Sequence, residues 1–142
     1  MSVPRALGLD LGERRIGVAV CDSAGTLATP HVVLTRTGDR HRDHARIAAL
    51  VDETGAEVVV VGLPLSLDGT AGPAANGVQA EVAELRDCLD VRLVTSDERL
   101  TTVEAQRRLD ARGLKRRQQR RLVDMLAATV ILQSWLDAQA PS

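Results

Sequence analysis

Aromatic side chains are almost absent from this chain of 142 residues, which has no Phe, no Tyr and a single Trp, Trp135. Hydrophobic residues still make up 44% of the sequence, so we expect a core of Val, Leu, Ile and Ala. Unpaired nucleic-acid bases are commonly bound by stacking on aromatic side chains, and one tryptophan is too few for such a platform. If the chain binds a nucleic acid, we therefore expect it to recognise backbone and shape.

Cysteine and long apolar runs are scarce as well. Cys21 and Cys88 are isolated, without Cys-X-X-Cys spacing, which argues against a disulfide framework or a zinc site and fits free thiols in a reducing cytosol. No signal-length apolar stretch precedes Asp10, and the longest uncharged apolar run, residues 125–136, is shorter than the roughly 20 residues of a membrane span. We therefore expect a soluble, cytoplasmic protein without a membrane partner, folded as a single domain over residues 1–142.

Positive charge is concentrated near the C-terminus, although the net charge of the chain is only -1. Residues 107–121 hold eight cationic residues and one acidic residue, a local net charge of +7. A basic segment on an otherwise acidic protein indicates a surface that faces a polyanion, and arginine suits bidentate phosphate contacts. A solvated, arginine-rich helix end is the alternative. The candidate nucleic-acid-binding residues are Arg15, Lys115, Arg116, Arg117, Arg120 and Arg121.

The beginning of the chain predicts a β-hairpin. Two apolar runs, Ala6–Leu11 and Ile16–Cys21, flank the four residues 12–15, which have the length and the glycine of a tight turn. Glycines stand at positions 8, 12 and 17, and glycine in or beside a strand often marks the close approach of a ligand or of another backbone. These glycines therefore support a close approach at this hairpin, in line with a ligand bound beside Asp10.

Asp10 is a carboxylate inside the first of these strands. Because side chains alternate along a strand, Leu9 and Leu11 should face the side opposite Asp10. An unpaired buried carboxylate is costly, so Asp10 needs a partner, and a metal ion, a cation or a metal-held phosphate ligand would serve. A hairpin with a salt-bridged aspartate is the alternative interpretation.

The rest of the chain alternates strand and helix patterns. Pro30 confines the third strand to a sheet edge or a bulge, and the apolar run Glu57–Gly62 is typical of a central strand parallel to the first. Asp39 and Gly55 have the positions of caps on a helix whose histidines we expect to be exposed rather than to bind a metal. The predicted elements are strands at 6–11, 16–21 and 27–34, a helix at 39–54, a strand at 57–62, a helix at 73–89, a strand at 91–95 and helices at 101–112 and 119–137.

Two later acidic positions are comparable to Asp10. The predicted strand at 91–95 runs directly into Asp97 and Glu98, which places acidic groups at the carboxyl end of a strand, where open α/β sheets bind ligands. Before a helix these residues could also be surface charges that suit its dipole. Asp124 is the only charged residue in the apolar part of the last helix, which we expect to be buried nearly all round. It therefore needs a partner for the same reason as Asp10.

Asp10, Glu98 and Asp124 together predict a metal-dependent catalytic site. Clustered oxygen ligands are what Mg²⁺ or Mn²⁺ requires, and two such ions can activate water and stabilise the leaving oxygen in phosphodiester cleavage. With the order of elements and the basic segment, these acids indicate an RNase H-like nuclease. The expected fold class is α/β, with a mixed five-stranded sheet of three antiparallel and then parallel strands, flanked by helices.

Four blocks of sequence resemble one known family: GLDLGERRIGVAV at 8–20, VVGLPLSLDGTAG at 60–72, DERLTT at 97–102 and DMLAATVILQSWL at 124–136. On these motifs the chain resembles the YqgF (RuvX) family of Holliday-junction-resolvase-like proteins, which are also described as nucleases of pre-16S ribosomal RNA. The resemblance implies an RNase H fold, catalytic acids at Asp10, Glu98 and Asp124, and cytoplasmic processing of the 5′ end of the small-subunit ribosomal RNA precursor. Within the DER motif Glu98 is preferred over Asp97, and Ser66 departs from the asparagine typical of its position.

Other functions are open at this point. A four-way DNA junction could be the substrate instead of pre-16S ribosomal RNA, and ribosome-assembly particles are further candidate partners. GLDLG also resembles the first phosphate loop of actin-like ATPases and sugar kinases, but those proteins need two such domains and this chain provides one. A non-catalytic RNA- or protein-binding module of the same fold is a third interpretation, which the presence of all three acids disfavours.

Overall fold

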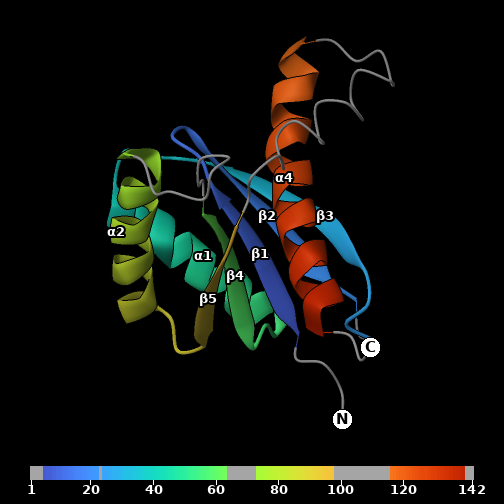
Figure 1. Ribbon diagram of the computed structural model, residues 1–142. Coiled ribbons are helices and arrows are strands. Elements are labelled where there is room, and N and C mark those ends of the chain that lie inside the picture. Colours follow the sequence, from blue (N-terminus) through green and yellow to red (C-terminus); the bar gives the residue numbers. More distant parts are fainter. Residues whose placement is uncertain (1–4, 23, 64–72, 98–115, 140–142) are drawn as a thin grey trace.

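In the computed structural model, one β-sheet lies between two layers of helices (Figure 1). The structure describes residues 5–22, 24–63, 73–97 and 116–139, and for residues 73–76, 97 and 116–125 it describes the backbone alone. Helices α1 and α2 cover one face of the sheet, and α4 covers the other. The described elements are β1 (Ala6–Leu11), β2 (Arg15–Cys21), β3 (Ala28–Thr35), α1 (Arg40–Thr54), β4 (Val58–Leu63), α2 (Pro73–Cys88), β5 (Arg92–Asp97) and α4 (Arg116–Gln139).

The five strands form a single mixed sheet in the order β3-β2-β1-β4-β5. β2 pairs antiparallel with both β1 and β3, whereas β1, β4 and β5 run parallel to one another. The predicted sheet of three antiparallel and then parallel strands is therefore confirmed. The hairpin of β1 and β2 and the position of β4 beside β1 are confirmed with it.

The edge strand β3 contains a bulge next to its proline. Val18 of β2 pairs with Val32, but the next residue, Ala19, pairs with Pro30, so that His31 is an extra residue on β3. Proline has no N–H to donate to a neighbouring strand, which confines it to such positions. The edge and the bulge, predicted as alternatives for Pro30, occur together.

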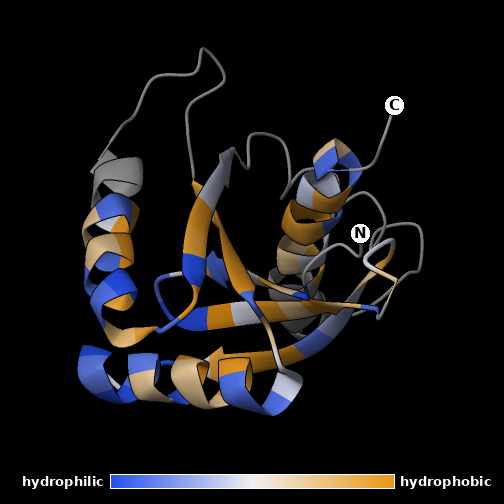
Figure 2. Ribbon diagram, turned by 90° about the horizontal axis from the view of Figure 1, so that it is seen from below, coloured by the Kyte–Doolittle hydropathy of each residue, from blue (hydrophilic) through white to orange (hydrophobic). Residues whose placement is uncertain are grey.

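Strand alternation divides the apolar residues into two cores, one on each face of the sheet. Figure 2 shows that the strands are largely hydrophobic, while α1 and α2 also carry hydrophilic residues. Both cores are aliphatic, as the composition predicts, and Trp135 is partly buried against the second. The first core, facing α1 and α2, includes Leu7, Leu9, Leu11, Ile16, Val18, Ile47, Val51, Val59, Val61, Val82, Leu85 and Leu93. The second, facing α4, consists of Ala6, Ala19, Ala28, Val58, Val60, Ala128, Ile131, Leu132 and Leu136.

Helix α1 begins and ends where the sequence predicts. Asp39 is its N-cap and accepts hydrogen bonds from two backbone N–H groups of the first turn. Gly55 is its C-cap, with a φ of 69° that favours glycine. The expected exposure of both histidines is partly wrong: His41 is exposed, but His44 is buried because it bonds to Glu81 of α2.

Two of the described elements differ from their predicted bounds by more than one residue at an end. β5 continues through Ser96 and Asp97, beyond its predicted end, because β4 pairs with both residues. α4 begins at Arg116 rather than at about Gln119, so part of the predicted basic linker is helix, which suits the good helix propensity of Arg and Gln. The helix predicted at 101–112 lies outside the described residues.

Helix α4 is buried on one side, not nearly all round as expected. Leu126 and Val130 are only partly buried, because a single face of the helix meets the sheet. That face holds Ala127, Ala128, Ile131, Leu132 and Leu136. Within the described part of the chain, no helix combines the length and the apolar character that crossing a membrane requires.

Candidate active site

Asp10 lies one residue before the end of β1, on the face of the sheet that α4 covers. Strand alternation puts it in line with Ala6 and Gly8, whereas Leu9 and Leu11 are buried in the core on the other face. The predicted separation of Asp10 from its leucine neighbours is thus confirmed. Asp10 is partly buried, whereas its neighbours Leu9 and Leu11 are buried.

Helix α4 lies very close to the sheet at Gly8. A Cβ atom at this position would lie 2.7 Å from Cβ of Leu132 and 2.9 Å from the carbonyl oxygen of Ala128. These distances are shorter than carbon contacts allow, so glycine is required wherever the helix keeps this position. The close contact expected on the hairpin is therefore, at Gly8, a contact with the backbone of α4.

Asp124 is carried by α4 one turn before Ala128. α4 and β1 run in opposite directions (Figure 1), so the segment before Ala128 extends toward the carboxyl end of β1. Four residues of helix rise about 6 Å, and the two strand residues from Gly8 to Asp10 advance about 6.6 to 7 Å. The turn of α4 that holds Asp124 therefore stands level with Asp10. Only the backbone of Asp124 is described.

The end of β5 reaches the same edge of the sheet. β1 and β5 flank β4, and extending the observed pairing of β1 by one residue puts Asp10 level with Ser96. With neighbouring strands about 4.8 Å apart, the two backbones are about 10 Å apart. Val94 packs in the core beneath α4. Strand alternation therefore assigns position 96 to the face of the sheet that α4 covers and position 97 to the opposite face. Glu98, the predicted ligand, lies outside the described residues.

The predicted nucleic-acid-binding residues are distributed over three segments. Arg15 is the first residue of β2, directly after the turn that follows Asp10. The N-terminal turns of α4 extend beyond the sheet at the end where β1 and β4 finish (Figure 1). Lys115 lies outside the described residues. The cationic residues in those turns of α4 are Arg116, Arg117, Arg120 and Arg121, whose backbones alone are described.

A metal site at this edge would need more donors than Asp10. Among the side chains that the structure describes, no group of three His, Cys, Asp or Glu residues is arranged to hold a metal ion. The predicted set extends beyond those side chains, because it includes Glu98 and Asp124. Its donor chemistry fits the expected ions, since carboxylates are hard oxygen ligands of the kind that Mg²⁺ and Mn²⁺ prefer.

The opposite face of the sheet holds a buried ionic cluster that the sequence does not predict. Arg36, at the end of β3, forms a bidentate pair with Glu81 of α2, and His44 of α1 bonds to the same carboxylate. Burial raises the pKa of the Glu81 carboxyl, but hydrogen bonds from Arg36 and His44 outweigh it and hold that pKa below its ordinary value. The available signal is the position of Glu81 between Val78 and Leu85 on the apolar stripe of α2, the same conflict of charge and burial that identifies Asp10.

Sequence comparisons match this chain to a family model and to curated relatives. The family model described as "RuvX: Holliday junction resolvase" matches residues 4–138. A protein of Desulforudis audaxviator (strain MP104C), named "Putative pre-16S rRNA nuclease", is 45% identical over 135 residues, which cover 95% of each chain. A protein of the same name from Crocosphaera subtropica (strain ATCC 51142 / BH68) is 44% identical over 96% of this chain and 95% of its own.

Solved structures of low sequence identity share the fold. RuvC of T. thermophilus in complex with a Holliday junction substrate has a TM-score of 0.60 at 16% identity and covers 96% of both chains. The yeast mitochondrial Holliday junction resolvase Ydc2 has a TM-score of 0.50 at 13% identity and covers 95% of this chain and 78% of its own. The predicted RNase H-like fold is thereby confirmed.

Proposed function

The chain belongs to the RuvX family, and we propose that it is a metal-dependent nuclease that processes the 5′ end of pre-16S ribosomal RNA. The proposal rests on the strand register and on the packing of α4 at Gly8, from which three segments are inferred to share one edge of the sheet: Asp10, the end of β5 directly before Glu98, and the turn of α4 that holds Asp124. The names of the relatives, 44 to 45% identical over almost the whole chain, favour ribosomal RNA as the substrate.

In the proposed site, Asp10, Glu98 and Asp124 supply carboxylate ligands for Mg²⁺ or Mn²⁺. When bound, these ions supply an activated water and stabilise the leaving oxygen of phosphodiester hydrolysis. The fold supports this proposal, because β1 and β5 belong to one sheet and Gly8 lets α4 lie against it. We choose Glu98 over Asp97 because position 97 of β5 is in register with Leu93 and so with the face of the sheet opposite Asp10.

Substrate binding is proposed for the cationic residues that share this end of the molecule. Arg15 follows the turn beside Asp10, and the arginines of α4 begin beyond the sheet edge. Guanidinium groups bind phosphate oxygens without reading base identity, which suits a chain with too few aromatic residues to stack bases. We propose that the segment containing Lys115, Arg116 and Arg117 binds the phosphates of the nucleic-acid backbone.

The test compares cleavage of precursor 16S ribosomal RNA and of a four-way DNA junction with and without Mg²⁺ or Mn²⁺. Asp10→Asn should lower metal-dependent cleavage by more than the roughly 10- to 100-fold typical of groups that only orient metal ligands. Its stability without metal should be unchanged or slightly raised, because one of several like charges is removed. Glu98→Gln should match this loss, and Asp97→Asn should be milder.

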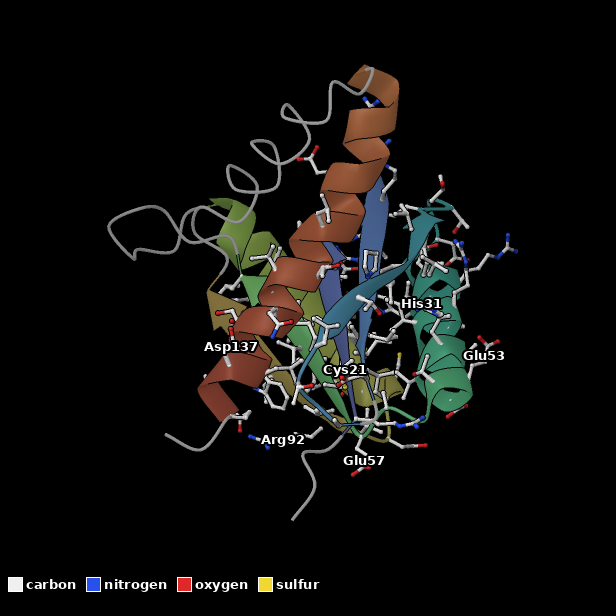
Figure 3. The ribbon with its side chains drawn as sticks, turned by 90° about the vertical axis from the view of Figure 1, so that its right-hand side faces the viewer. Cys21, His31, Glu53, Glu57, Arg92 and Asp137 are labelled. Carbon is white, nitrogen blue, oxygen red and sulfur yellow. The ribbon has the colours of Figure 1, made fainter. Side chains whose placement is uncertain are left out.

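Asp137→Asn is the matched control. Figure 3 shows Asp137 near the C-terminal end of α4, at the end of the molecule where Glu57 and Arg92 lie. Its side chain bonds to Gln133 at 2.9 Å, so the variant should retain full cleavage. Full activity of Asp10→Asn would contradict the proposed mechanism. If Asp97→Asn lost more activity than Glu98→Gln, Asp97 and not Glu98 would be the metal ligand.

A four-way DNA junction is the second candidate substrate. It is favoured by the likeness in fold to RuvC in complex with a Holliday junction substrate, which extends over 96% of both chains. Preferential cleavage of the junction in the same assay would support this substrate over ribosomal RNA. Binding of either nucleic acid without cleavage in any divalent metal would instead indicate a non-catalytic module.

A further inference from the structure

Arg36 donates hydrogen bonds to two carbonyl groups of the turn between β1 and β2, one near each end of the turn. Its Nε donates to the carbonyl oxygen of Gly12 at 2.7 Å, and its backbone N–H donates to the carbonyl oxygen of Arg14 at 2.9 Å. Its Nη1 and Nη2 donate to the two carboxylate oxygens of Glu81, at 2.9 and 2.8 Å. One side chain therefore joins this turn to helix α2 on the face opposite α4.

Glu81 fixes the direction in which Arg36 points. The carboxylate, 5% exposed, also bonds to Nε2 of His44 at 2.8 Å, and Nε of Arg40 lies 3.9 Å away. Among the described residues, no buried side-chain nitrogen or oxygen lacks a hydrogen-bond partner. A fully satisfied buried network favours one arrangement of its members, because each alternative leaves a charge unpaired. Arg36 is therefore held from both α1 and α2.

The turn that Arg36 holds is continuous with Asp10. The N–H of Gly12 donates to the carbonyl oxygen of Asp10 at 3.1 Å. The turn is also tightly closed, since a Cβ atom at Gly12 would lie 2.6 Å from the carbonyl oxygen of Arg15. A shift of Gly12 would therefore move the peptide group of Asp10 and the start of β2 together.

We propose that Arg36 is a positioning residue for Asp10, an inference that rests on the proposed nuclease function. Through its bond to Gly12 it holds the turn after β1, so that the carboxylate of Asp10 keeps one position relative to α4 and β5. The buried pair with Glu81 supports this bond from the far face of the sheet. Groups that orient metal ligands typically affect metal affinity or activity by about 10- to 100-fold, and we place Arg36 among them.

Arginine is the side chain that this position requires. A planar guanidinium offers donors in three directions, and Arg36 uses them on a carbonyl oxygen and on both oxygens of a carboxylate. Lysine has a single terminal nitrogen, so Arg36→Lys keeps the positive charge beside Glu81 but cannot make all three bonds. This variant separates the charge of the buried pair from the bond to Gly12.

Arg46→Lys is the matched control in the same region. Arg46, on α1, donates to the carbonyl oxygen of Thr35 at 2.7 Å and lies 3.7 Å from Asp43. It therefore joins α1 to the end of β3, one residue before Arg36, through contacts away from the Gly12 turn. Its loss should affect stability without a specific effect on Asp10.

The experiment compares wild type, Arg36→Lys and Arg46→Lys by three measurements. Calorimetric titration of the substrate-free protein with Mn²⁺ should show affinity about 10-fold weaker in Arg36→Lys and unchanged in Arg46→Lys. Hydrogen exchange of the metal-free proteins should be faster at the turn amides only in Arg36→Lys. In cleavage assays, kcat should fall by about 10-fold or more while KM for the nucleic acid changes little.

The possible outcomes distinguish the positioning role from the proposed function. If wild type binds Mn²⁺ and cleaves, and both lysine variants lose affinity and activity only in proportion to their loss of stability, the positioning role is overturned and the nuclease function stands. If wild type itself neither binds Mn²⁺ nor cleaves, both are refuted. Should Arg36→Lys fail to fold, Glu81→Gln replaces it, with an expected smaller loss of Mn²⁺ affinity, and an unchanged affinity overturns the role.

Discussion

Replacement of Gly8 by alanine tests how the site is assembled, because this residue sets the distance between α4 and β1. The added Cβ would lie 2.7 Å from Cβ of Leu132 and 2.9 Å from the carbonyl oxygen of Ala128. Ordinary carbon contacts are about 3.5 to 4.0 Å. The obstructing atoms belong to or adjoin the helix backbone, so no side-chain rotation relieves the contact. We expect α4 to move away by about 1 Å at this point.

The expected effect on stability follows from two opposing contributions. Overpacking of a closed core costs about 1 to 3 kcal/mol, while exchanging a strand glycine for alanine recovers about 0.4 to 1 kcal/mol from the unfolded chain. The recovery applies because the described glycines with positive φ are Gly25, Gly38 and Gly55, and Gly8 is not one of them. The net loss is about 1 to 2 kcal/mol, or roughly 3 to 8 °C in Tm for a domain of this size.

The expected effect on cleavage is larger than the effect on stability. Asp124, a proposed metal ligand, lies on α4 one turn before Ala128, and a misplacement of about 1 Å at a reacting group can cost about 100-fold in rate. Gly8→Ala should therefore remain folded at 25 °C and yet lose about 100-fold in metal-dependent cleavage. Thermal unfolding by circular dichroism and single-turnover cleavage measure the two effects on the same preparation.

Gly77→Ala is the control for the same chemical change. Gly77 lies exposed on α2, and among the described residues a Cβ there meets no atom within 4 Å. Alanine should stabilise this helix by up to about 1 kcal/mol and leave cleavage unchanged. If Gly8→Ala were as stable and as active as Gly77→Ala, α4 would not pack on Gly8 as described. If Gly8→Ala lost stability but kept full activity, Asp124 would not belong to the catalytic site.

Two further predictions concern the basic segment and the buried ionic cluster. Replacing Lys115, Arg116 and Arg117 by alanine should lower the magnitude of the slope of log affinity against log salt by roughly two to three for any nucleic-acid sequence, at about 0.7 to 0.9 per lost phosphate contact. Arg92→Ala, at the opposite end of the molecule (Figure 3), should leave the slope unchanged, and an unchanged slope in the triple variant would refute direct phosphate contact. The pKa of Glu81 is lowered in the folded protein, so its contribution to stability is complete above its ordinary value of 4.5 and is lost as pH falls through the lowered value. The free energy of unfolding, from urea titrations at several pH values, should therefore fall more steeply below about pH 4.5 in wild type than in Glu81→Gln, and parallel profiles would contradict the assignment.

The sequence predicts best those features that neighbouring residues determine. Asp39 and Gly55 are a cap acceptor and a glycine suited to positive φ, so the bounds of α1 are set locally. The β1–β2 hairpin likewise follows from two apolar runs and a short turn with Gly12. Asp10 is identified as a candidate by the same local reasoning, because a carboxylate between two leucines of a strand is unusual wherever that strand lies.

Features that depend on distant partners are not predicted. β5 includes the polar residues Ser96 and Asp97 because β4 pairs with them, and no property of the segment itself reveals that partner. Arg36 and Glu81 are 45 residues apart, and their pairing requires α2 to lie beside the end of β3. His44 is buried by the same pairing. Such contacts determine which residues surround the candidate site, whereas its proposed ligands are predictions from the sequence.

The near absence of aromatic residues has a practical consequence for observing this protein. Trp135 is the only tryptophan of the chain, there is no tyrosine, and the side chain is partly buried where α4 meets the sheet. Intrinsic fluorescence, which in most proteins averages over several emitters, here comes from one indole in one place. Its emission is therefore a built-in reporter of whether α4 is docked, and a shift in wavelength on adding a divalent ion or a nucleic acid can be assigned to that single helix without any label.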